Sequence, residues 1–270
     1  MNNKHTAVFV ALGLIAVFVV LAIWYAIAHR ESSPIPTNTA TTTPTAGVEA
    51  PAGHLSDVGK YYDAKAAYPS ATPLLATAGA TANAEAVLAM KNFAQKNIDS
   101  FKDNGNFANL TAEDIKVQGL DKRKYTLGMS YKMYTGMQTV SYVFTMNEDT
   151  LGAHPNTYFR TFTFDTKSGQ WLELGDLFVE ASPYLERISK ETRADLPIIL
   201  NMKSGMPADA DMIKNGTYPD IDSFLNFAID GDTLQIIFPP YQVAAYVFGA
   251  VIDPIKLSKL SDILKPVYIP

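Results

Sequence analysis

Residues 124–147 of the chain read KYTLGMSYKMYTGMQTVSYVFTMN, and this stretch determines the predicted fold. Apolar and polar residues alternate over 124–134 and again over 139–147, with Thr135-Gly136 as a turn between the two runs. Alternation with a period of two places the apolar side chains on one face of a sheet. The stretch therefore predicts an antiparallel hairpin with one apolar face, which must be covered by another element.

Further strands are predicted on both sides of a long helical region. They cover residues 158–165 (YFRTFTFD), 171–174, 224–230, 233–238 and 251–257. Asp230-Gly231-Asp232 has the composition of a tight hairpin turn. Residues 54–81 are expected to form an extended entry strand and a loop.

Two main helices are expected. Residues 83–103 carry an apolar stripe at steps of three and four, with Asn83 as the N-cap and Asn104-Gly105 as the stop. The stripe consists of Val87, Met90, Ala94, Ile98 and Phe101. Ser182 as cap and Pro183 at the first helical position start a second helix, which runs to about residue 200. A short helix is expected at 260–264. The fold class is α+β, with antiparallel sheet(s) covered by these two helices.

Residues 7–28 (AVFVALGLIAVFVVLAIWYAIA) contain no charged residue. About 20 apolar residues suffice for a helix to cross the hydrocarbon core of a bilayer. A cleaved signal peptide is the alternative, because Ala26-Ile27-Ala28 has the small-residue pattern of a cleavage site and Lys4 precedes the apolar run. The length of the run favours an uncleaved transmembrane helix.

A Thr/Pro-rich stalk, residues 29–53, follows that helix. Such stalks separate a membrane helix from an extracytoplasmic domain. We therefore expect residues 1–6 to be a cytoplasmic tail, 7–28 the membrane anchor, and 54–270 a domain on the extracytoplasmic side of the cell membrane.

The composition excludes several classes of function. The sequence has no cysteine, which excludes disulfides, thiol catalysis, zinc–thiolate sites and lipid attachment to a thiol. Lys4 and Arg30 are the only basic residues before Glu31, so 20 basic residues accompany 27 acidic ones in the rest of the chain. This acidic balance disfavours nucleic acid and would attract a cationic partner.

Three motifs, in order along the chain, resemble one known family. They are 152–158 (GAHPNTY) with 164–169 (FDTKSG), 174–178 (LGDLF), and 224–227 (FLNF) with 238–244 (FPPYQVA) and Gly249. The sequence around Tyr61-Tyr62 and Tyr68-Pro69 is similar to the segment that precedes them in that family. Over residues 55–265 the chain thus resembles the RsiV/PdaC-type extracytoplasmic domain family, although Ala245 stands where the family usually has proline.

The resemblance implies an α+β domain displayed outside the cytoplasmic membrane. The family includes the lysozyme-sensing ectodomain of an anti-sigma factor and the accessory domain of a peptidoglycan deacetylase. An anti-sigma activity needs a sigma-binding segment on the cytoplasmic side, where we expect only residues 1–6. Deacetylation needs a second, catalytic domain. Neither activity is expected to carry over to this chain.

Candidate site residues lie in two of these motifs: His154, Asn156 and Tyr158 in the first, and Tyr241, Gln242 and Tyr246 in the last. Pro239-Pro240 fixes an extended backbone, which would display Tyr241 and Tyr246 as interface anchors. The alternative is that these rings fold back onto the sheet. We predict no catalytic residue, no metal ligand and no cofactor.

Three functional hypotheses remain from the sequence. The preferred one is a non-catalytic binding or sensing domain of the cell envelope, with peptidoglycan or a lysozyme-like protein as partner. The second is a cell-wall hydrolase or esterase that uses His154 as acid–base residue, and the third is a structural role in the envelope. The carboxylates of Asp209, Asp211, Asp220 and Asp222 could suggest calcium, but they lack the spacing of a calcium loop.

Overall fold

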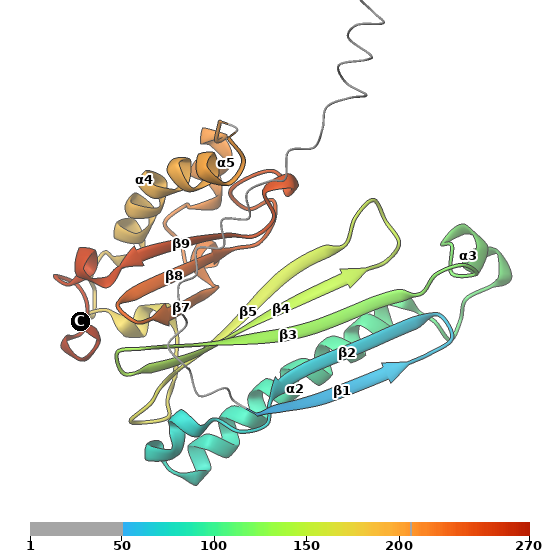
Figure 1. Cartoon of the computed structure of the whole chain (residues 1–270), viewed down its shortest axis with the longest axis horizontal. Helices are drawn as coiled ribbons and strands as arrows, with labels where there is room; N and C mark the ends of the chain where they lie inside the picture. Colours follow the sequence, from blue (N-terminus) through green and yellow to red (C-terminus); the bar gives the residue numbers. More distant parts are fainter. Residues whose placement is uncertain (1–50, 206) are drawn as a thin grey trace, which may run out of the picture. The chain divides into compact units, whose positions relative to one another are not determined.

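The computed structural model describes residues 51–205 and 207–270 (Figure 1). These residues form a six-stranded sheet with strand order β1-β2-β3-β4-β5-β6 and a three-stranded sheet with strand order β7-β8-β9. The larger sheet contains β1 (Ala52–Val58), β2 (Tyr62–Pro69), β3 (Tyr125–Gly136), β4 (Thr139–Asp149), β5 (Asn156–Asp165) and β6 (Trp171–Leu172). The smaller sheet contains β7 (Phe227–Asp230), β8 (Thr233–Phe238) and β9 (Val251–Lys256).

Two long helices cover the sheets, as the sequence predicts. They are α2 (Ala80–Gly105) and α4 (Tyr184–Ser204). The short helices are α3 (Ala112–Val117), α5 (Ala210–Gly216) and the 3-10 turns η1 (Pro73–Ala78), η2 (Leu174–Leu177), η3 (Asp222–Phe224), η4 (Tyr246–Phe248), η5 (Leu257–Leu260) and η6 (Pro266–Tyr268). The α+β class is confirmed.

The larger sheet is mixed and not purely antiparallel, which corrects one expectation. β2 and β3 run parallel, with Tyr62 opposite Tyr125, whereas all other neighbouring strands in the sheet are antiparallel. The reason is the connection: η1, α2 and α3 lie between β2 and β3. A helical crossover returns the chain to the edge at which β2 began, so β3 starts in the same direction.

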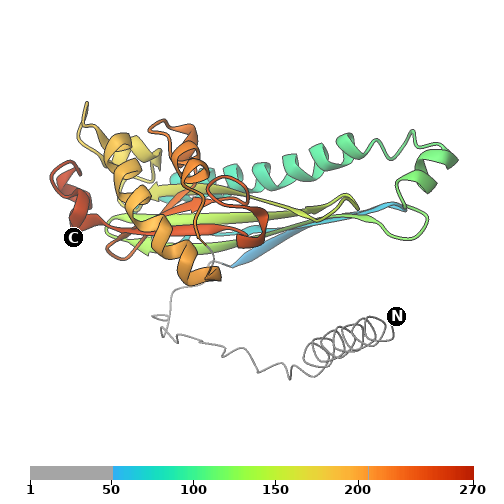
Figure 2. The same cartoon turned by 90° about the horizontal axis from the view of Figure 1, so that it is seen from above.

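The helix α2 lies along one face of the larger sheet (Figure 2), and the core of that sheet is packed beneath it. Met90, Ala94 and Ile98 of the helix are buried together with Tyr142 and Phe144 of β4. Val87 is only half-buried, and Ala86 takes its place among the buried residues of the stripe. Because side chains alternate along a strand, the intervening residues of β4 face away from α2.

The smaller sheet packs on that opposite face. Val143 of β4 is buried against Ala228 of β7 and Ile237 of β8. The neighbouring residues of β7 and β8, among them Ile229 and Ile236, point the other way into a core that α4 covers. The order of layers is thus α2, the six-stranded sheet, the three-stranded sheet and α4.

β7 is an edge strand, and hydroxyl groups of the larger sheet satisfy its free backbone donors. The N–H of Phe227 donates to Thr161 Oγ1 at 3.3 Å, and the N–H of Ile229 donates to Ser141 Oγ at 3.2 Å. Just beyond β7, in the β7–β8 turn, the N–H of Gly231 donates to the backbone carbonyl of Thr135 at 2.8 Å. A buried N–H without an acceptor is costly, so these three hydrogen bonds make the contact between the sheets specific.

Several predicted boundaries and turns are corrected. α2 begins at Ala80, and Asn83 accepts hydrogen bonds from Thr72 instead of capping the helix. Pro183, and not Ser182, occupies the N-cap of α4. The β3–β4 turn is formed by residues 137–138, with Met137 at a φ of 47°, and Gly136 still belongs to β3. Residues 224–230 form a strand only from Phe227, and the short helix expected at 260–264 is instead the 3-10 turn η5, at Leu257–Leu260.

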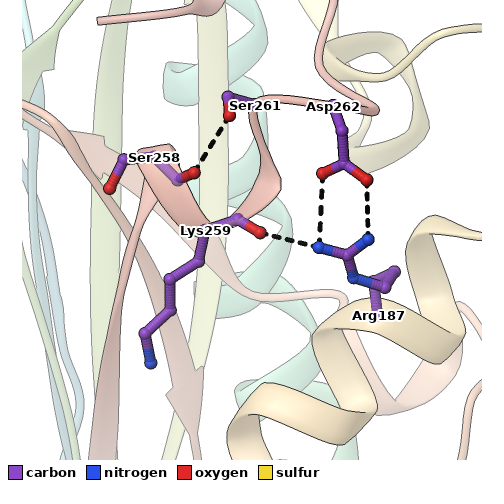
Figure 3. Close-up of polar contacts among 5 residues, drawn as sticks. All are labelled: Arg187, Ser258, Lys259, Ser261 and Asp262. Carbon is purple, nitrogen blue, oxygen red and sulfur yellow. Dashed lines mark hydrogen bonds and ion pairs between the residues drawn. The ribbon is translucent and has the colours of Figure 1, made fainter.

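A guanidinium group joins α4 to the C-terminal segment (Figure 3). Arg187 donates to both carboxylate oxygens of Asp262, at 2.8 and 3.3 Å, and to the carbonyl oxygen of Lys259 at 2.8 Å. The paired geometry lowers the pKa of the Asp262 carboxyl below its ordinary value. These contacts hold η5 and the residues after it against the helix.

The predicted anchor at 7–28, like the tail at 1–6, lies outside the described residues. Within residues 51–205 and 207–270, no helix is both long enough and apolar enough to cross a membrane.

Candidate functional site

Three of the six predicted site residues come together where two loops meet. His154 lies on the loop between β4 and β5, and Tyr241 and Tyr246 lie between β8 and β9. The ring of His154 stacks on that of Tyr246, with centroids 3.7 Å apart and an interplanar angle of 18°. His154 Nε2 lies 2.9 Å from the hydroxyl of Tyr241, and the hydroxyl of Tyr246 donates to the carbonyl of Pro155 at 3.0 Å. We call His154, Tyr241 and Tyr246 the aromatic cluster.

Tyr241 occupies a strained backbone position in a tight turn. The N–H of Gln242 donates to the carbonyl of Pro239, which makes Pro240 the second residue of the turn and Tyr241 the third. Tyr241 has a φ of 73°, a value that glycine or asparagine usually supplies at the third position of a type II turn. Tyr241 is 56% exposed, so burial of the residue does not account for this conformation. A bulky residue held in this conformation is the kind of outlier from which a functional role can be inferred.

The other three predicted residues do not join the aromatic cluster. Asn156 is exposed at the start of β5, opposite Glu148. Tyr158 packs against the core under α2, and its hydroxyl donates to Glu148 Oε2 at 3.2 Å. Burial, reinforced by the Glu148 charge, raises the pKa of Tyr158 to about 12. Gln242 Nε2 donates to the carbonyls of Gly216 and Ser223, both at 2.9 Å, and so holds the loop between α5 and β7.

The imidazole of His154 contacts one backbone carbonyl and one phenol. Its Nδ1 lies 3.1 Å from the carbonyl of its neighbour Pro155, and its Nε2 contacts the phenol of Tyr241. Within the described part of the chain, no carboxylate and no serine or threonine hydroxyl forms a hydrogen bond with the imidazole.

The aspartates that could have suggested calcium serve local backbone structure where the structure shows their contacts. Asp209 caps α5 by accepting from the N–H groups of Asp211 and Met212, and Asp220 accepts from the N–H of Ser223. In residues 51–205 and 207–270, no group of three or more acidic or histidine side chains is placed to hold a metal ion.

A second feature, which none of the sequence motifs predicts, lies along β5. Arg160 and the exposed Trp171 of β6 line a groove of about 300 Å³. The sequence does hold a hint of this groove in the run YFRTFTFD. Arg160, Phe162 and Phe164 are at alternate positions and therefore lie on the same face of the strand, where the arginine is the only charged residue of the three. The position of Arg160 on the apolar face can be predicted from the alternation. Its contact with the ring of Trp171 cannot, because that contact depends on the β5–β6 hairpin.

Comparisons with known proteins agree with this fold. A family model described as "Protein of unknown function (DUF3298)" matches residues 175–258, which include α4 and the three-stranded sheet. Crystal structures of DUF3298 family proteins from Pseudomonas aeruginosa PAO1 and Bacteroides fragilis NCTC 9343 each superpose with a TM-score of 0.51, at 14% and 17% identity. The matches cover 82% and 80% of this chain and 97% and 92% of those chains, and at such identities they show a common fold.

One curated relative is similar in sequence. Peptidoglycan-N-acetylmuramic acid deacetylase PdaC of Bacillus subtilis (strain 168) is 33% identical over 182 residues. The match covers 67% of this chain but only 36% of PdaC, so the chain spans about a third of the length of that relative. The sequence match, the family model and the common fold agree, and the chain belongs to a PdaC-like family of domains that contain DUF3298.

Proposed function

We propose that this domain is a non-catalytic binding module of the cell envelope whose partner is peptidoglycan. The observation that carries the proposal is the aromatic cluster, in which exposed Tyr241 is held in a strained turn against His154 from another loop. Preorganised aromatic side chains with hydroxyl groups are effective interface anchors, since they lose little conformational entropy on binding. The similarity to PdaC, whose name refers to peptidoglycan, supports the choice of ligand.

The test is sedimentation of the full-length protein with purified insoluble peptidoglycan. Wild type is expected to sediment, and Tyr241→Ala combined with Tyr246→Ala should weaken binding by a factor of about 10 or more, as truncation of central aromatic anchors does. Tyr218→Ala is the matched control, because Tyr218 is 61% exposed and lies outside the aromatic cluster. Wild-type protein that stays in the supernatant would contradict the proposal.

A soluble lysozyme-like protein is the second partner to test, in the same format. The chain carries an excess of acidic residues, which would attract such a protein if it is cationic. Capture of lysozyme, without binding to peptidoglycan, would favour the sensing role over the wall-binding role. Hydrolysis or deacetylation of wall polymer by the protein, lost in His154→Ala, would instead favour an enzyme.

We also propose that residues 7–28 anchor the chain in the cell membrane with the domain outside. The support is the length of the apolar run and the Thr/Pro-rich composition of the segment after it. Protease added to intact cells is expected to cleave in residues 29–53 and remove the full-length band, while a cytoplasmic marker stays intact. A full-length band that persists until the cells are lysed would contradict this placement.

A further inference from the structure

The groove along β5 is a partly apolar surface with an aromatic rim. It lies beside β5, whose pairing with β6 is limited to Thr163 and Phe164. Trp171 and Leu225 at the rim are 43% and 48% exposed. Buried Phe224 and Phe227 also line it. A groove with one exposed indole and apolar neighbours can hold a small ring that has an apolar face.

Arg160 supplies a cation to this groove. Its guanidinium lies 5.5 Å from the ring centroid of Trp171 and 5.6 Å from that of Phe162. Stacking on two aromatic rings orients the group and leaves its N–H donors free. In the part of the chain that the structure describes, Arg160 takes part in no ion pair. A carboxylate from outside could therefore pair with it in a two-point hydrogen bond.

Glu173 gives the groove a negative charge, opposite in sign to that of Arg160. It is exposed and also lines the groove. Its carboxylate can accept hydrogen bonds from hydroxyl or amide N–H groups but would repel an anion beside it. A suitable ligand therefore carries its acidic group at one end and its donors at the other.

We propose that this groove binds a carboxylate-bearing amino sugar, the chemical class of N-acetylmuramic acid. The C–H face of the pyranose would stack on Trp171, the carboxylate would pair with Arg160, and hydroxyl or acetamido N–H groups would donate to Glu173. The inference rests on the proposed function, since it takes its ligand from the same polymer. It adds a second binding site for peptidoglycan, separate from the aromatic cluster, and it names the sugar that the domain binds there.

Tryptophan fluorescence of the full-length chain tests the inference. The sequence has two tryptophans, Trp24 and Trp171, so Trp24→Phe leaves Trp171 as the only reporter. The probes are a disaccharide of N-acetylglucosamine and N-acetylmuramic acid, and the di-N-acetylglucosamine disaccharide, which lacks the carboxylate. We expect the acidic disaccharide to bind at least about tenfold more tightly, because a bidentate guanidinium–carboxylate pair is a strong contact.

Arg160→Met should remove this preference while leaving the affinity for the neutral disaccharide within about twofold, because the stem can still pack on the rings. Lys132→Met is the matched control, since Lys132 is also an exposed cation over an aromatic ring, that of Tyr134 at 4.5 Å. The control should bind both probes as the parent does. Equal tenfold selectivity in the Arg160→Met and parent proteins would overturn the inference.

The outcome separates this inference from the proposed function. If the protein sediments with peptidoglycan but neither disaccharide changes Trp171 emission, the groove is not a sugar site and the proposed function stands. If the protein does not sediment with peptidoglycan and binds neither disaccharide, the proposed function and the inference about the groove are both wrong. Thermal unfolding of each variant shows that a loss of binding is not a loss of the fold.

Discussion

Gly136→Ala is expected to lower the free energy of unfolding by about 1–3 kcal/mol, the usual cost of overpacking a tight contact. A Cβ at this position would lie 2.5 Å from the carbonyl oxygen and 2.8 Å from the nitrogen of Gly231. Both are backbone atoms of the β7–β8 turn, which the hydrogen bond from Gly231 to Thr135 fixes in place. They cannot move aside as a flexible side chain would, so the two sheets must separate locally.

Gly128→Ala is the matched control, because Gly128 lies in the same strand, β3, and nothing is within 4 Å of its added Cβ. Thermal unfolding measures the difference, at roughly 2–4 °C of Tm per kcal/mol for a domain of this size. Gly128→Ala should change Tm little, and equal Tm values for the two variants would show that the contact between the sheets is not tight.

Elements with a local pattern could be predicted from the sequence. The β3–β4 hairpin, β5 and the stripe on α2 follow from side-chain periodicity, which depends only on neighbours in the chain. Thr135-Gly136 is the predicted turn between β3 and β4, because glycine usually marks a turn. Gly136 is instead required by the close approach of Gly231, and Met137 takes the positive φ.

Features that depend on contacts between distant segments could not be predicted. The parallel pairing of β2 with β3 follows from the crossover through α2, and the hydroxyl groups that receive the edge of β7 come from residues 66 and 88 positions away. The same holds for the candidate site. The motifs indicate His154, Tyr241 and Tyr246, but they do not show which of their residues face a partner. Gln242, directly after Tyr241, donates to the carbonyls of Gly216 and Ser223 and so has a structural role.

A buried carboxyl group on β9 gives the domain a pH-dependent stability. Asp253 is fully buried, and burial is the main cause that raises its pKa to about 6. The Asp195 and Glu191 charges of α4 raise the pKa further, while the Thr192 hydroxyl and the Lys259 charge oppose the shift. Thr192 is near enough to favour the carboxylate, but neither Asp253 oxygen has a hydrogen bond of ordinary geometry in the described residues.

Because the folded pKa of Asp253 lies above the unfolded value of 3.8, the folded state holds the proton more tightly than the unfolded chain. The contribution of this group to stability is therefore complete below about pH 4 and is lost as the pH rises through about 6. Asp253→Asn keeps the shape of the side chain and removes the charge. We expect the variant to be more stable than wild type at pH 7.5 by on the order of 2–3 kcal/mol, and nearly equal to it at pH 4.

Chemical denaturation at both pH values measures this difference. Asp230→Asn, which removes an exposed carboxyl group from β7, controls for the change in net charge. A gain from Asp253→Asn that is the same at pH 4 and pH 7.5 would mean that the carboxyl group does not titrate in this range. Lower stability of the variant at pH 7.5 would mean that the carboxylate has stronger partners than its surroundings show. The expected gain implies that the fold of this domain tolerates a destabilising carboxyl group between β9 and α4.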